Sequence, residues 1–167
     1  LSGGMKQKLA LSCALIHTPA LIVLDEPTFG VDPVSRVEFW QILHTLKREG
    51  VSIVVSTPYM DEASLCDQIS LLHKGEVIGQ GSPQEVISTW QGKLYKLKSP
   101  QLQELYIYLQ GKTDKANLQL FGSEIHMYSE TALPQTLIVI WQKEHPQLES
   151  CEEIQPGMED VFLRMMR

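Results

Sequence analysis

The sequence predicts an α/β protein in which a parallel sheet comes first and a smaller α+β module follows. Two short apolar runs, "ALIVLDE" at 20–26 and "VSIVVST" at 51–57, are typical of strands buried on both faces of a parallel sheet. A segment with helical signals precedes each run. After about residue 89 the pattern changes to strand, helix, strand, strand, helix, strand.

The helices of the first part begin and end at recognisable signals. Residues 5–17 predict a helix that ends before Pro19, because the residue before a proline disfavours helical dihedrals. Asp32 is the expected N-cap of a second helix, with Pro33 in its first turn, and Gly50 is expected to end it. Two parallel strands are fewer than most sheets contain, so we expect an incomplete sheet.

Shorter elements follow the second strand. Residues 59–66 predict a short helix, and residues 68–82 predict a hairpin that turns at Lys74–Gly75. Ser82 and Glu85 have the spacing of a capping box, which predicts that another helix begins there.

The remaining residues predict a small α+β sandwich that resembles a split βαβ unit. The expected elements are a strand at 93–99, a helix at 100–111, a hairpin at 117–130, a strand at 147–154 and a helix at 157–167. Residues 132–144 are compatible with a helix or a strand, because "LIVIW" is apolar and rich in β-branched side chains.

Composition narrows the class of protein. The net charge of −6 argues against nucleic acid as the main partner. No apolar run approaches the roughly 20 residues that cross a bilayer, and the first residues lack the order of a signal peptide. The three cysteines are odd in number and widely spaced, which is typical of reduced thiols in a cytosolic protein.

An apolar strand that ends in two acids is the strongest chemical signal. In open α/β folds, ligands bind at the carboxyl ends of the strands, where Asp25 and Glu26 are expected. Asp25 is a candidate Mg²⁺ ligand, because Mg²⁺ takes few carboxylates and keeps several waters. Glu26 is a candidate for polarising an attacking water. Two solvated acids that merely end a strand are the alternative.

Two glycines at the start of a helix are the second signal. In "LSGGM", Gly3 and Gly4 would let backbone N–H groups approach a phosphate, and Ser2 adds a hydroxyl donor. A plain glycine turn leading into a helix is the alternative interpretation.

Taken together, these signals resemble a known family. Residues 1–33 resemble the segment from the signature motif to the D-loop of ABC-transporter ATPases, and the resemblance extends to about residue 90. It implies that residues 1–90 are the C-terminal half of a RecA-like P-loop ATPase domain. Residues 91–167 would then be an accessory domain. The ending "MEDVFLRMMR" resembles that of ATPases serving ABC-2-type and drug-export transporters.

The resemblance implies roles for individual residues. It assigns Asp25 to the Mg²⁺ ion and Glu26 to the catalytic base, and it places Asp32 of the D-loop at the interface between two ATPase domains. The positions expected to contact the γ-phosphate of ATP held by the opposite domain are Ser2, Gly3 and Gly4. Met5 stands where the family usually has glutamine.

Two departures from the family pattern limit the expected activity. The P-loop pattern, GxxxxGK followed by Ser or Thr, is absent from the sequence, so we expect a fragment that is inactive alone. Pro58 stands where the family has a switch histidine, and proline has neither a donor nor a titratable group. The site at this position is therefore expected to be degenerate.

The resemblance implies an ATP-binding and ATP-hydrolysing component of an exporter, with ATP and Mg²⁺ as cofactors. The expected partners are a second ATPase domain and an integral-membrane permease, with no nucleic acid. The expected location is the cytoplasmic face of the membrane. Two alternatives remain: a degenerate ABC domain that regulates without hydrolysis, and a soluble ABC-type ATPase without a membrane partner.

Overall fold

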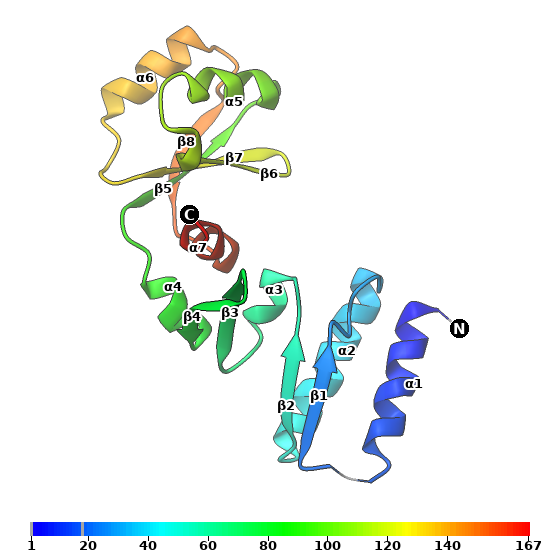
Figure 1. The fold of residues 1–167 in the computed structure, drawn as a ribbon. Coiled ribbons are helices and arrows are strands. Elements are labelled where there is room, and N and C mark those ends of the chain that lie inside the picture. The colour runs from blue at the N-terminus through cyan, green and yellow to red at the C-terminus, as the bar shows by residue number, and fades with distance from the viewer. Residues whose placement is uncertain (1, 18) are drawn as a thin grey trace. The chain divides into compact units, whose positions relative to one another are not determined.

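The computed structural model describes residues 2–17 and 19–167. The chain divides into two compact units, one ending at Leu65 and the other beginning at Cys66 (Figure 1). The α/β class predicted from the sequence is confirmed.

The first unit alternates helices and strands. Its elements are α1 (Gly3–Leu15), β1 (Leu21–Asp25), α2 (Pro33–Arg48), β2 (Ser52–Ser56) and α3 (Met60–Ala63). The two strands pair in parallel, with Leu21 opposite Ser52 and Asp25 opposite Ser56, as the sequence predicted. The helix α1 begins at Gly3, two residues earlier than expected, because Ser2 caps it by accepting a hydrogen bond from the Met5 backbone N–H.

The strands of the first unit are covered on one face only. Ile22 is buried, whereas Val23, whose side chain points to the opposite face of the strand, is 69% exposed. Leu21 and Val54 are also exposed. Among the described residues, the sheet of this unit consists of β1 and β2 alone, and one of its faces is left exposed. The prediction that both faces are buried is therefore wrong for this unit.

The second unit begins with a hairpin and a short helix. The hairpin joins β3 (Ile69–His73) to β4 (Glu76–Gly81) through Lys74 and Gly75, which both have positive φ, as in a type I′ turn. The helix α4 (Pro83–Ser88) has the predicted capping box. We expected these elements to accompany residues 1–65, but they group with the second unit, where α4 contacts α7 and Gly79 faces the Met165 side chain.

The rest of the second unit is the predicted split βαβ arrangement. Its elements are β5 (Lys93–Lys98), α5 (Leu102–Gln110), β6 (Leu118–Phe121), β7 (Glu124–Ser129), α6 (Gln135–Glu144), β8 (Ser150–Ile154) and α7 (Met158–Met165), with a short 3₁₀ turn before β6. The strand order is β6-β7-β5-β8, with antiparallel neighbours. The ambiguous segment is the helix α6, whose Trp141 packs into the core.

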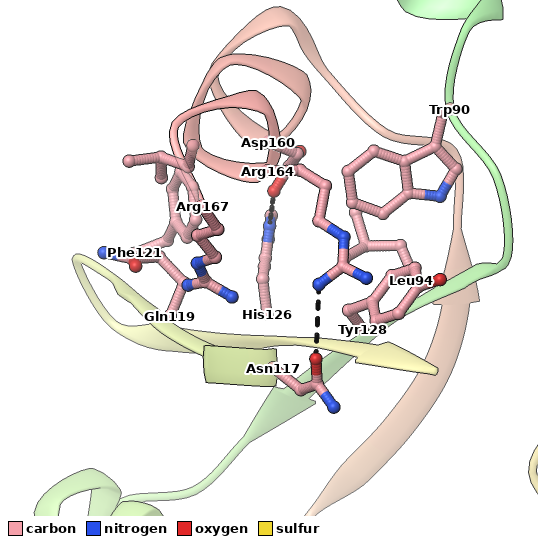
Figure 2. A pocket seen from close by; sticks show the side chains of 11 residues that line it. Trp90, Leu94, Asn117, Gln119, Phe121, His126, Tyr128, Asp160, Arg164 and Arg167 are labelled. Atoms are coloured by element: carbon pink, nitrogen blue, oxygen red, sulfur yellow. Dashed lines mark hydrogen bonds and ion pairs between the residues drawn. The ribbon is translucent and has the colours of Figure 1, made fainter. Parts of the chain in front are cut away.

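Side chains pack against both faces of this four-stranded sheet. One face carries a core that includes Leu97, Leu105 and Ile125, which are fully buried. On the other face, α7 lies over β7 (Figure 2), where Asp160 is hydrogen-bonded to His126 at 2.6 Å. The Arg164 guanidinium stacks 3.7 Å from the centre of the Tyr128 ring.

Candidate functional site

The turn after β1 holds Glu26 in an unusual conformation. Glu26 has φ of 42°, a left-handed value that a non-glycine residue adopts only when the surroundings hold it there. Its backbone N–H donates to the Ser56 carbonyl at 3.1 Å and to Ser56 Oγ at 2.9 Å. The exposed Glu26 is thus fixed to the end of the neighbouring strand.

Asp25 is tied to the same serine. Ser56 Oγ donates a hydrogen bond to Asp25 Oδ1, across the parallel strands β1 and β2. Asp25 is exposed and lies at the carboxyl end of β1. Carboxylate and hydroxyl oxygens at this edge are the donors that Mg²⁺ prefers, so the residues present fit a magnesium ion.

The glycines at the start of α1 have a packing role that sequence analysis missed. A Cβ atom at Gly4 would lie 2.6 Å from both Cβ and Oγ of Ser35 in α2, closer than real Cβ atoms approach. A Cβ atom at Gly3 would lie 3.5 Å from the Gly30 carbonyl oxygen, an ordinary contact. Gly4 therefore allows the two helix N-termini to touch, while the neighbouring Met5 is exposed.

Asp32 caps α2, as predicted. Its Oδ1 accepts a hydrogen bond from the Ser35 backbone N–H at 2.9 Å. This bond from Ser35 lowers the pKa of the Asp32 carboxyl below its ordinary value. Because Ser35 also lies against Gly4, the N-termini of α1 and α2 meet at one end of the first unit.

The predicted site residues thus fall into two groups. One group consists of Ser2, Gly3, Gly4, Met5 and Asp32, at the N-termini of α1 and α2. The other consists of Asp25, Glu26 and Pro58, at the carboxyl ends of β1 and β2. Pro58 is exposed and offers no side-chain hydrogen bond.

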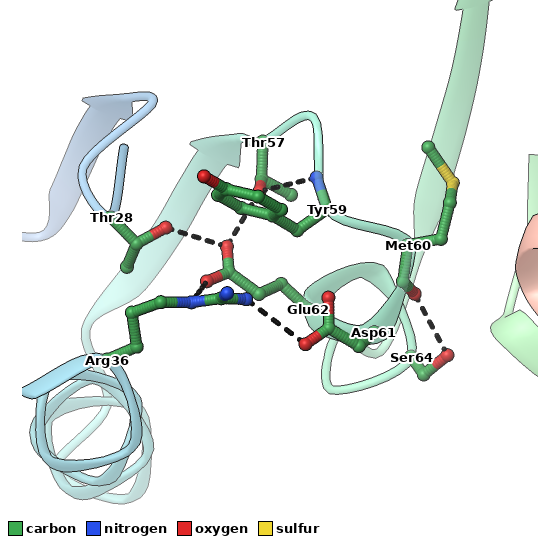
Figure 3. Close-up of polar contacts among 8 residues, drawn as sticks. All are labelled: Thr28, Arg36, Thr57, Tyr59, Met60, Asp61, Glu62 and Ser64. Atoms are coloured by element: carbon green, nitrogen blue, oxygen red, sulfur yellow. Dashed lines mark hydrogen bonds and ion pairs between the residues drawn. The ribbon is translucent and has the colours of Figure 1, made fainter. Parts of the chain in front are cut away.

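A buried carboxylate joins the loops beside this second group, and sequence analysis did not find it. Glu62 is 2% exposed and accepts hydrogen bonds from Thr28 Oγ1 at 2.9 Å, Thr57 Oγ1 at 2.6 Å and Arg36 Nε at 3.1 Å (Figure 3). The sequence offered one usable signal: Thr28 and Thr57 each follow a predicted parallel strand.

Arg36 is held by further contacts around the same carboxylate. Its Nη2 donates to Asp61 Oδ2 at 3.1 Å, and its guanidinium carbon lies 4.1 Å from the centre of the Tyr59 ring. Figure 3 shows Arg36 reaching from α2 toward Glu62 and Asp61. The arginine therefore compensates the charge of a carboxylate that would otherwise be costly to bury.

The structure bears on membrane insertion in one respect. Within residues 2–17 and 19–167, no helix combines the length and apolar character needed to cross a membrane.

The fold and site define an α/β protein with an acidic pair at the carboxyl edge of parallel strands, the class that includes many nucleotide-binding proteins. The family model described as "ABC transporter" matches residues 1–29. The chain is 48% identical over 100 residues to the "Probable multidrug ABC transporter ATP-binding protein YbhF" of Escherichia coli, covering 60% of this chain and 17% of that protein.

A second relative matches along almost the whole chain. It is the "Nod factor export ATP-binding protein I" of Rhizobium sp. strain N33, 35% identical over 167 residues, covering 99% of this chain and 53% of that protein. The solved structure of cbiO1 from Clostridium perfringens, part of the ABC transporter complex cbiONQ, overlaps with a TM-score of 0.49 and 36% identity, over 53% of this chain and 36% of that one. The chain belongs to the ABC transporter family of ATP-binding proteins.

Proposed function

We propose that the protein containing this chain is the ATP-binding and ATP-hydrolysing component of an ABC exporter. The observation that carries the proposal is the Asp25–Glu26 pair, fixed by Ser56 at the carboxyl edge of two parallel strands in a chain of this family. The names of two relatives refer to multidrug transport and to Nod factor export, which supports export. The chain spans only 17% and 53% of those relatives.

The proposed reaction is attack of water on the γ-phosphate of ATP. Glu26 would accept a proton from that water, and Asp25 together with Ser56 would hold Mg²⁺. When bound, Mg²⁺ neutralises charge on the phosphate oxygens. At the other end of the first unit, backbone N–H groups near Gly3 and Gly4 would face the ATP of a second ATPase domain.

The proposed partners follow from the family. A second ATPase domain, identical or different, would complete the ATP site, and an integral-membrane permease would carry the substrate. The proposed location is therefore the cytoplasmic face of the membrane.

Pro58 supports a second candidate function, in which the domain binds ATP and regulates without turnover. Proline cannot contact a γ-phosphate by donating a hydrogen bond, so one site of an asymmetric pair would be weak. The complete gene product is the protein encoded by the whole open reading frame that contains this sequence. If Pro58 limits hydrolysis, Pro58→His should raise ATP turnover in the complete gene product. Unchanged turnover would remove this explanation.

Substitution of Glu26 distinguishes hydrolysis from regulation. In the complete gene product, Glu26→Gln should lower ATP turnover about 100-fold or more and leave ATP bound between the domains, because the proton acceptor is lost. The exposed Glu49 supplies the matched control, and Glu49→Gln should keep wild-type turnover. Equal turnover in wild type and Glu26→Gln would favour regulation. Full turnover in a product recovered only outside the membrane fraction would favour a soluble ATPase.

The isolated 167-residue chain gives a complementary test. Calorimetric titration with Mg-ATP should show no binding tighter than about millimolar, because the sequence holds no P-loop lysine to grip the phosphates. Saturable micromolar binding would mean that this chain forms a site of another kind.

A further inference from the structure

One buried carboxylate links the three segments on which the proposed reaction depends. Thr28 lies two residues after Glu26, Thr57 directly precedes Pro58, and Arg36 lies four residues after Asp32. The side chains of all three donate hydrogen bonds to Glu62. Glu62 thus connects three stretches of the first unit that lie apart in the sequence.

Two sets of hydrogen bonds, called ties below, consequently connect the loops after β1 and β2. Ser56 forms the first tie, through Asp25 and the Glu26 backbone N–H. The second tie runs from Thr28 through Glu62 to Thr57. A strained residue such as Glu26 keeps its conformation only where its surroundings over-determine it, and two independent ties meet that requirement.

The hydrogen bonds of Glu62 indicate that it orients neighbouring groups and does more than fill space in the core. An apolar side chain of similar size would fill the same space, often at no loss of stability, but it would not fix the direction of two hydroxyl groups. Charge-assisted hydrogen bonds are short and directional, and the Thr57 contact of 2.6 Å is of that kind.

We propose that Glu62 is a positioning residue for ATP hydrolysis, which sets the separation of the loop carrying Glu26 from the loop carrying Pro58. The inference rests on the proposed function. Glu62 acts through Thr28 and Thr57 and contacts neither ATP nor the attacking water. Arg36 is part of the same device, because it compensates the charge of Glu62 and anchors the group to α2.

The test is steady-state ATP hydrolysis by the complete gene product carrying Glu62→Gln. The amide keeps the volume but loses the charge that binds Arg36, so kcat should fall about tenfold or more while KM changes less than about twofold. Asp61→Asn is the matched control, because it removes an exposed partner of the same arginine. It should leave kcat within about twofold of wild type.

A second pair of variants covers the case in which Glu62→Gln does not fold. Thr28→Val keeps the shape of a buried side chain but removes the hydroxyl, and Thr28→Ser keeps the hydroxyl. Positioning predicts that kcat falls in Thr28→Val and is retained in Thr28→Ser, at equal folded fractions by circular dichroism. Equal kcat values in the two variants would overturn the proposal.

The outcomes separate this inference from the proposed function. If wild type shows no turnover, or if Glu26→Gln leaves turnover unchanged, the proposed function fails. If Glu26→Gln abolishes turnover but a folded Glu62→Gln keeps the wild-type kcat, only the positioning role of Glu62 fails.

Discussion

The two compact units bury their sheets in different ways. In the first, β1 and β2 are covered on one face, and Leu21 and Val23 are exposed on the other. In the second, helices α5 and α6 cover one face of a four-stranded sheet and α7 contacts the other. The second unit therefore buries side chains on both faces of its sheet. The first buries apolar side chains such as Ile22, Phe39 and Leu43, leaves one face of its strands exposed, and adds polar contacts such as those of Glu62.

The largest expected difference concerns core deletion. Leu105 of α5 is 0% exposed, so Leu105→Ala should lower the free energy of unfolding of the second unit by about 2–5 kcal/mol. The matched change Leu21→Ala removes a side chain that is 53% exposed and should cost less than about 1 kcal/mol in the first unit. Hydrogen exchange of the 167-residue chain, followed in each unit, measures both. Equal losses of unfolding free energy in the two variants would contradict the difference between the two units.

A smaller effect is expected where the first unit is closely packed. Gly4→Ala puts a Cβ atom against Ser35 and should destabilise the first unit by about 1–3 kcal/mol, because overpacking displaces α1 from α2. Gly3→Ala meets only an ordinary contact and should be neutral or slightly stabilising, because alanine is the better helix former. Thermal unfolding of both variants tests the contrast. A neutral Gly4→Ala would show that the helices separate at little cost.

The smallest expected effect is a pH dependence in the second unit. Burial lowers the pKa of His126, but its hydrogen bonds and charge interactions with Asp160 and Glu124 outweigh burial, so the pKa is raised. The Phe121 ring stacks on the imidazole, and Arg164 and Arg167 line the same pocket (Figure 2). A raised pKa means that protonated His126 stabilises the folded state. That stabilisation is complete below the unfolded pKa of about 6.5 and disappears as pH rises through the raised value.

The variant His126→Gln isolates this contribution. The difference in the free energy of unfolding between wild type and variant should shrink as pH rises above about 6.5, measured by urea unfolding at several pH values. A difference that is constant with pH would show that the imidazole acts only as a neutral hydrogen-bonding group.

Local signals in the sequence account for much of the fold. Asp32, Ser82 and the Lys74–Gly75 turn were predictable, because a cap or a tight turn needs particular side chains within a few residues. The segment 132–144 was ambiguous, because tertiary packing of Trp141 decides it. The exposed face of β1 was missed, because apolar runs alone indicate burial.

The candidate site was predictable only in part. Asp25 and Glu26 follow an apolar strand, and their position at its carboxyl end is as expected, but their roles stay predictions. Glu62 was missed because its partners Thr28 and Arg36 are 34 and 26 residues away in sequence. The contact of Gly4 with Ser35 was missed for the same reason, since it depends on how two helices meet.

The contact between Gly4 and Ser35 has an electrostatic consequence. It brings the N-termini of α1 and α2 together, and Figure 1 shows that the two helices run in the same direction. Each helix dipole places about half a positive elementary charge at its N-terminus, so their fields add and the helices repel weakly. The carboxylate of Asp32 offsets this field. One end of the first unit thus carries about one positive charge from peptide dipoles, which no count of lysine and arginine residues records.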